Sequence, residues 1–83
     1  MRIKIVAGNW KMNLDLQSSV DLAKEVNLQL QNKNLDGKRV LIAPNFAFLQ
    51  KLASSKEINH LEFASQNIHH EASGAYTGEV SAE

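Results

Sequence analysis

The stretch IVAGNWKMN, residues 5–13, decides the fold, because an apolar run gives way at once to polar side chains without a cluster of turn residues. The run at residues 3–7 is rich in β-branched side chains, which is typical of a strand. Gly8 follows directly and allows the backbone to turn or to approach another group closely. We therefore predict a buried strand that stops at Gly8.

A change of period marks the first helix. Between residues 18 and 31, apolar side chains recur at three- and four-residue steps, which indicates an amphipathic helix. Ser18 and Asp21 have the spacing of a capping box, so we expect the helix to begin at Ser18. Its expected polar side carries Asp21, Lys24, Glu25 and Asn27.

Two more strands and a second helix follow. The apolar run at residues 40–43 predicts a buried strand closed by Pro44, and Asn45 is the expected cap of a helix that reaches about residue 55. A third strand is expected at residues 61–64. The order is β-α-β-α-β, and strands joined through helices run parallel with right-handed crossovers.

The predicted class is α/β, but the predicted elements are too few to complete it. Parallel sheets are normally covered on both faces, which three strands and two helices cannot provide. We therefore expect residues 1–83 to be the N-terminal part of one larger α/β domain, with no internal boundary.

The amino-acid composition argues against some classes of binding partner and of metal site. Nine basic and nine acidic side chains cancel, which argues against a nucleic acid or a membrane surface as partner. Cysteine is absent, so the chain has neither a disulfide framework nor a cysteine-based metal site. No run has the length of a signal-peptide core or a membrane span. We expect a soluble protein of the cytoplasm.

Polar side chains follow the predicted strands at their carboxyl ends, where ligands gather in parallel α/β folds. Strand alternation would send Asn9 and Lys11 to one side and Trp10 to the other. An amide beside an ammonium suits an anionic, oxygen-rich ligand. The corresponding positions after the other two strands are residues 44–45 and 65–67.

Each of these residues also has a simpler interpretation. Lys11 could be an ordinary solvated lysine, and Trp10 is better interpreted as a core anchor than as a stacking platform. Gln66 and Asn67 are better interpreted as turn-forming residues.

A metal site is not predicted. His60, His69, His70 and Glu71 lie close in sequence, but neighbouring His69 and His70 point in different directions, whereas helical zinc sites place histidines four residues apart. We interpret them as loop histidines. The sequence also contains no phosphate-binding glycine loop and no nucleophile elbow.

Three motifs together resemble those of triosephosphate isomerase. They are GNWKMN at residues 8–13, ASQN at 64–67 and SGAYTGEVSAE at 73–83, and the resemblance covers the whole chain in order and spacing. IAPN is a looser match, since the family often has a second proline at the position of Asn45. The resemblance implies a TIM (β/α)₈ barrel of about 250 residues, of which this chain is the first third.

The resemblance also implies an activity. The family interconverts dihydroxyacetone phosphate and glyceraldehyde 3-phosphate through an enediolate, in glycolysis and gluconeogenesis and without a cofactor. Lys11 would be the catalytic and substrate-binding cation that balances the phosphate and the developing oxyanion, with Asn9 beside it at the substrate oxygens. The family's glutamate base, histidine electrophile, lid and phosphate-binding loops lie beyond Glu83, so we expect the isolated chain to be inactive.

The resemblance gives the last loop a role in a homodimer. In the family, the loop that corresponds to residues 73–79 reaches into the neighbouring subunit. Thr77, at its tip, would pack near the partner's copies of Asn9 and Lys11. The other implied interface residues are Gly74, Ala75, Tyr76 and Gly78. The alternative is a mobile surface loop, which we expect in an isolated fragment.

Two rival functions remain open. The first is a stand-alone binding or interaction module that uses residues 65–78 and the exposed strand edges. The second is another phosphosugar barrel enzyme that keeps Lys11 and differs downstream.

Overall fold

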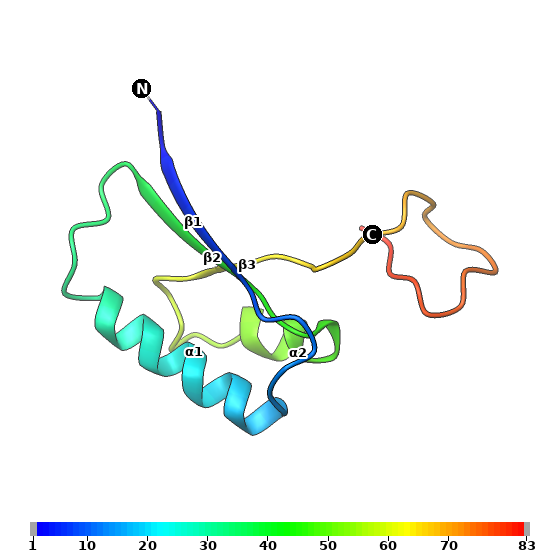
Figure 1. The fold of residues 1–83 in the computed structure, drawn as a ribbon, viewed down its shortest axis with the longest axis horizontal. Coiled ribbons are helices and arrows are strands. Elements are labelled where there is room, and N and C mark those ends of the chain that lie inside the picture. The colour runs from blue at the N-terminus through cyan, green and yellow to red at the C-terminus, as the bar shows by residue number, and fades with distance from the viewer. Residues whose placement is uncertain (1, 83) are drawn as a thin grey trace.

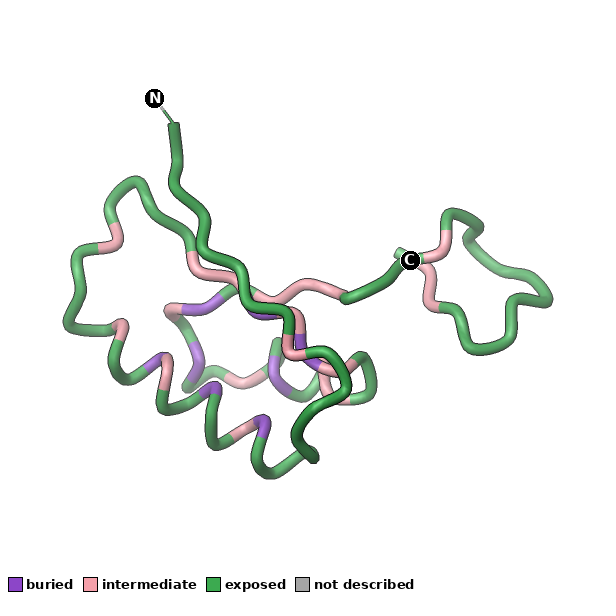
Figure 2. The backbone as a smooth tube through the Cα atoms, viewed as in Figure 1, coloured by how far each residue is buried: buried purple, intermediate pink, exposed green. Residues whose placement is uncertain are grey.

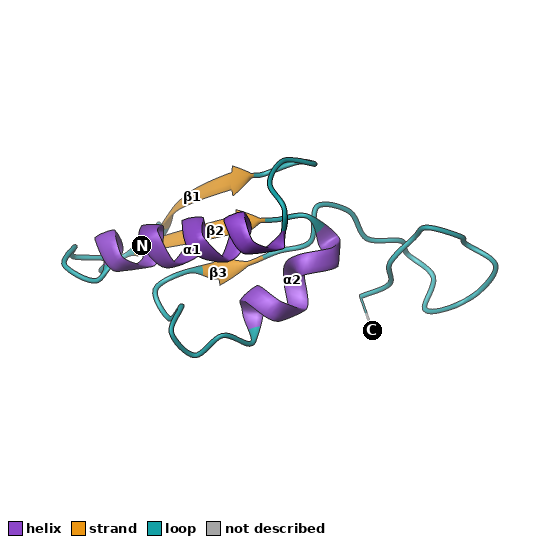
Figure 3. Ribbon diagram, turned by 90° about the horizontal axis from the view of Figure 1, so that it is seen from below, coloured by secondary structure: helices purple, strands orange, loops and turns teal. Residues whose placement is uncertain are grey.

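The computed structural model describes residues 2–82 and contains three parallel strands that alternate with two helices. The elements are β1 (Lys4–Asn9), α1 (Leu16–Leu30), β2 (Lys38–Ala43), α2 (Phe46–Ala53) and β3 (Glu62–Phe63). The strands lie side by side in the order β1-β2-β3 (Figures 1 and 3). The predicted β-α-β-α-β order is confirmed, and the sheet does not close into a barrel within the described residues.

The cap of α1 differs from the prediction. The carboxylate of Asp15 accepts a hydrogen bond of 2.8 Å from the backbone N–H of Ser18, and the helix begins at Leu16. The predicted capping box of Ser18 and Asp21 is therefore wrong. Asp15 satisfies one of the N–H groups that a first helical turn leaves unpaired, so Ser18 belongs to that first turn.

The cap of α2 is confirmed. Asn45 precedes the helix, and its side-chain oxygen accepts a hydrogen bond of 3.0 Å from the N–H of Ala47. The helix ends at Ala53, close to the expected position. Asn45 therefore caps the start of this helix.

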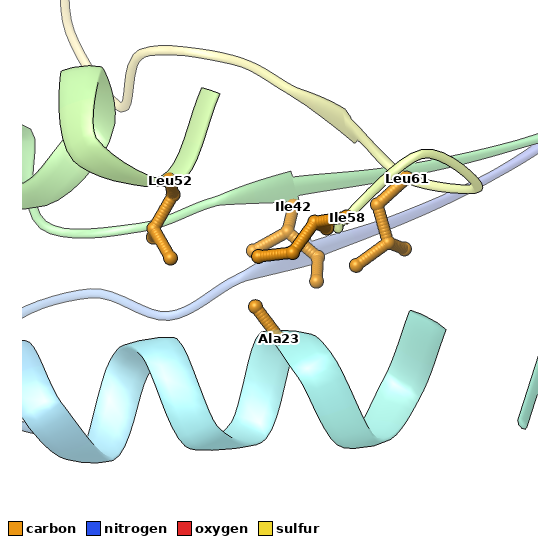
Figure 4. Packing of buried hydrophobic residues seen from close by; sticks show 5 residues of the cluster. All are labelled: Ala23, Ile42, Leu52, Ile58 and Leu61. Carbon is orange, nitrogen blue, oxygen red and sulfur yellow. The ribbon is translucent and has the colours of Figure 1, made fainter. Parts of the chain in front are cut away.

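The buried core lies between the sheet and the helices. Both helices lie on one side of the strands (Figure 1), and the buried positions gather there (Figure 2). Ala23 of α1 points toward the side chains from the sheet, α2 and the segment before β3 (Figure 4). The core residues are Ala23, Ile42, Leu52, Ile58 and Leu61.

The opposite face of the sheet has no cover within the described residues. All six residues of β1 are exposed, with Ile5 56% and Val6 67% accessible, so the prediction of a buried first strand is wrong here. The uncovered face accounts for alternate residues of β1. The remaining residues are exposed because β1 is an edge strand on which neither helix packs extensively. The strand also runs through Gly8 to Asn9 instead of stopping at Gly8.

The prediction that Asn27 lies on the polar, solvent-facing side of α1 is wrong. It is only 5% exposed and faces the segment before β3, where its amide donates to the carbonyl of Glu57 at 3.0 Å and its oxygen accepts from the N–H of His60 at 2.6 Å. A buried amide is stable when it is hydrogen-bonded in this way. Asn27 therefore fastens α1 to the chain that leads into β3.

Candidate functional site

The three strand ends lie at one edge of the sheet. Asn9 and Ala43, the last residues of β1 and β2, are partners in the parallel register, and the N–H of Ala64 donates to the carbonyl of Ile42 at 3.0 Å. The N–H of Trp10 continues the ladder to the carbonyl of Ala43 at 3.0 Å. Residues that follow the strands therefore gather at this edge, as the sequence predicts.

Alternation along β1 separates Asn9 from Trp10. Trp10, Val40 and Ile42 pack in the core on the helix side of the sheet, which confirms Trp10 as a core anchor. Side chains of neighbouring strand residues point to opposite faces. Asn9 therefore belongs to the face that the helices leave open.

Lys11 lies in a tight turn after the strand, with a left-handed backbone at φ 54°. Strand alternation ends at Asn9, so that argument does not place the Lys11 side chain. The turn is held by hydrogen bonds: the Asn9 side-chain oxygen accepts from the N–H of Lys11 at 2.9 Å, and the carbonyl of Trp10 accepts from both the backbone and the side-chain amide of Asn13. The side chain of Asn9 thus shapes the backbone that carries Lys11.

Gln66 links all three strand ends, a role that the sequence analysis missed. Its side-chain amide donates to the carbonyl of Lys11 at 2.8 Å and to the carbonyl of Ala43 at 2.9 Å. The interpretation as a turn-forming residue does not account for these bonds. Asn67, next in the chain, donates from its amide to the carboxylate of Glu79 at 3.1 Å and so ties the last loop to the end of β3.

Two donors at this edge have no partner among the described residues. In residues 2–82, no hydrogen bond is formed by the amide nitrogen of Asn9, and the ammonium of Lys11 takes part in none of the ion pairs. A neutral donor and a cation, carried here by residues two positions apart in the chain, form a donor set that can hold the oxygens of an anion. This is the ligand chemistry that the sequence predicts for the site.

The histidines are distributed over two places. His60 meets Asn27 beside α1, whereas the rings of His69 and His70 lie 4.5 Å apart between their centres in the last loop. The Nε2 atom of His70 lies 3.5 Å from the Oε1 atom of Glu71. Within residues 2–82, no three His, Asp or Glu side chains cluster closely enough to hold a metal ion.

The last loop closes on itself at its base. The N–H of His69 donates to the carbonyl of Val80 at 2.7 Å, and His69 pairs with Ser81 in a parallel bridge. The ring of Tyr76 packs on His69 with 4.1 Å between centres. The loop stands away from the sheet and helices (Figure 1) and surrounds a hollow of about 130 Å³.

Two glycines permit the shape of this loop. Gly74 and Gly78 have φ values of 141° and 84°, a backbone conformation that residues with a side chain rarely adopt. A Cβ on Gly74 would also lie 2.6 Å from the ring of Tyr76. Gly74, Ala75, Tyr76, Thr77 and Gly78 are all exposed, so they are free of contacts that would bury them in the described part of the chain.

The alternating parallel fold, with its strands side by side in chain order, is consistent with part of a (β/α) barrel. A family model described as triosephosphate isomerase matches residues 4–83. The chain belongs to the triosephosphate isomerase family.

Individual relatives agree with the family model. Triosephosphate isomerase of Flavobacterium psychrophilum is 41% identical over 83 residues, which is 100% of this chain and 32% of the relative. The enzymes of Chloroherpeton thalassium and Porphyromonas gingivalis are 46% and 43% identical, each over 99% of this chain and 32% of the relative. The chain thus spans about a third of the length of the curated relatives it matches.

Helices of the described residues are also too short or too polar to cross a membrane.

Proposed function

We propose that this chain forms the N-terminal part of an active triosephosphate isomerase, which interconverts dihydroxyacetone phosphate and D-glyceraldehyde 3-phosphate in glycolysis and gluconeogenesis. The observation that carries the proposal is the turn after β1, where the Asn9 side chain holds the backbone of Lys11 at the open end of the sheet. The membership of the family supports this activity.

In this proposal, Lys11 has the catalytic role and binds substrate together with Asn9. The ammonium balances the charge of the phosphate and of the oxyanion that develops in the enediolate, and the amide nitrogen of Asn9 donates to a substrate oxygen. A fixed positive charge stabilises such a transition state most when it does not have to reorient during the reaction. The hydrogen-bonded turn around Lys11 favours a fixed position of its backbone.

The proton-transfer groups are not assigned to these 83 residues. We expect the glutamate base and the histidine electrophile of the family in sequence beyond Glu83, and we expect the isolated 83-residue polypeptide to be inactive. An open parallel sheet with an exposed first strand also makes it prone to aggregation.

The proposed assembly is a cytoplasmic homodimer built through the loop at residues 73–79. The tip residues are exposed, and the loop stands away from the rest of the chain, which suits insertion into a partner subunit (Figure 1). Thr77 would then contact the turn that carries Asn9 and Lys11 in the other copy. No cofactor, nucleic acid or membrane is part of the proposal.

The direct test is the substitution Lys11→Met in the full-length protein. We expect a loss of isomerase turnover of several orders of magnitude with little change in thermal unfolding, because the substitution removes an exposed charge and no core contact. Lys33→Met, in the turn after α1, is the matched control and should keep wild-type turnover. Unchanged turnover in Lys11→Met would refute the assigned role.

The alternative is a stand-alone interaction module, and the self-closed loop at residues 69–81 is the feature that favours it. The intact mass of the natural protein separates the two proposals. A mass near 9.2 kDa with cooperative unfolding of a monomer would favour the module.

A further inference from the structure

We propose that Gln66 is a positioning residue for the isomerase reaction, which it serves by holding the backbone of Lys11. The inference rests on the proposed function, because it concerns the placement of the ammonium that the function assigns to catalysis. The juxtaposition that carries it is one side-chain amide bonded to the carbonyls of Lys11 and Ala43.

The backbone of Lys11 requires outside support. Its φ of 54° lies in the left-handed region, where the Cβ of any residue except glycine crowds its own backbone. Such a conformation persists when the surrounding structure over-determines it, and it is common in functional turns. A support that fixes Lys11 is therefore expected nearby, and we expect it to act on the peptide groups because the residue is exposed.

Both polar backbone atoms of Lys11 are bonded to side-chain amides. Asn9 accepts from its N–H at 2.9 Å, and Gln66 donates to its carbonyl at 2.8 Å. The bond from Asn9 spans two residues and is part of the same turn, so it can move with that turn. The bond from Gln66 spans 55 residues and is the one that fixes the turn relative to β3.

The second bond of Gln66 makes the link rigid. Its amide nitrogen also donates to the carbonyl of Ala43 at 2.9 Å, and that carbonyl in turn accepts from the N–H of Trp10. A primary amide has two N–H donors in one plane, so both are used and the nitrogen is held between two fixed acceptors. The carbonyl of Lys11 is thereby positioned against the ends of β2 and β3 together.

No similar side chain reproduces this geometry. Leucine has nearly the same size but no donor, and the carboxylate of glutamate only accepts at neutral pH and would face two carbonyl oxygens. Protonated glutamate regains one donor. Displacement of a reacting group by about 1 Å can reduce a rate about 100-fold, so a small shift of the Lys11 backbone is sufficient for a large kinetic effect.

The experiment compares Gln66→Leu and Gln66→Glu with wild type in the full-length protein. We expect kcat/KM to fall about 10- to 100-fold in both variants, with a fall in kcat and a weaker affinity for inorganic phosphate, at temperatures where both remain folded. The ratio of Gln66→Glu to wild-type kcat/KM should rise as the pH falls and the carboxylate gains a proton. Gln17→Leu is the control, because Gln17 bonds only locally to Asp21 on α1, and it should behave as wild type.

Wild-type kcat/KM in Gln66→Leu would overturn the proposal, as would a lowered melting temperature with unchanged kinetics of the folded fraction. A crystal structure of Gln66→Leu tests the geometry separately. If the wild-type protein shows no isomerase turnover, the proposed function fails. The φ of Lys11 in the variant then decides the positioning claim: departure from the left-handed region supports it, and an unchanged φ overturns it.

Discussion

The side-chain oxygen of Asn27 accepts a hydrogen bond of 2.6 Å from the backbone N–H of His60, which joins the last turn of α1 to the segment that enters β3. Its amide nitrogen donates to the carbonyl of Glu57. We expect Asn27→Leu in the full-length protein to lower the free energy of unfolding by about 1–3 kcal/mol, because two backbone groups lose their partner. Urea denaturation measures the change, and Gln29→Leu, on the exposed side of the same helix, should change it little.

Leu52 belongs to the hydrophobic core and is 0% exposed. Leu52→Ala should lower the free energy of unfolding by about 2–5 kcal/mol, since it removes buried methyl groups and leaves a cavity. Leu28→Ala is the matched control, because Leu28 is 52% exposed. Equal losses for the two variants in urea denaturation would contradict the core described here.

Arg39 and Glu62 form a two-pronged ion pair between β2 and β3, with N–O distances of 2.7 and 2.6 Å. The hydrogen bonds from Arg39 lower the pKa of Glu62 below its ordinary value of 4.5. A carboxylate with a lowered pKa stabilises the fold above 4.5, and this contribution is lost as the pH falls through the lowered pKa.

The pH dependence gives the test of this pair. The difference in urea midpoint between wild type and Glu62→Gln should be constant above about pH 5.5 and should shrink as the medium becomes more acidic than pH 4.5. Glu25→Gln, on the exposed side of α1, provides the control. If the difference in urea midpoint between wild type and Glu62→Gln grew as the pH fell, the predicted direction of the pH dependence would be wrong.

Asn45 caps α2 through its side-chain oxygen. Asn45→Ala should lower the free energy of unfolding by about 1 kcal/mol, because the N–H of Ala47 loses its acceptor. Asn45→Asp keeps an acceptor at the helix start and should remain close to wild type in thermal unfolding. A comparable loss in Asn45→Asp would mean that the amide has another role.

The order of the elements could be predicted from the sequence because it follows from local signals. The β-branched runs, the helical period and the cap at Asn45 each act within a few residues. Gly74 and Gly78 have positive φ values, which glycine adopts more readily than other residues. Asp15 could have been found by the same reasoning, since it also has the residue type and position of a cap.

The location of the candidate site could be predicted from the sequence, but the hydrogen bonds that hold its residues in place could not. The end of a parallel strand predicts polar residues at one edge, and Asn9 and Lys11 lie there. The bonds of Gln66 to Lys11 and of Asn27 to His60 join residues 55 and 33 positions apart. Local patterns carry no information about such pairs, so the burial of Asn27 and the left-handed turn at Lys11 could not be predicted.

The outer edge of β1 pairs with no strand within residues 2–82. In a (β/α) barrel whose strands follow chain order, the outer edge of the first strand is met by the last strand. Closure of this kind joins the most distant parts of a polypeptide and is therefore slow. Until a barrel of this kind closes, the exposed Ile5 and Val6 are accessible to neighbouring nascent chains, and chaperone protection matters most during that interval.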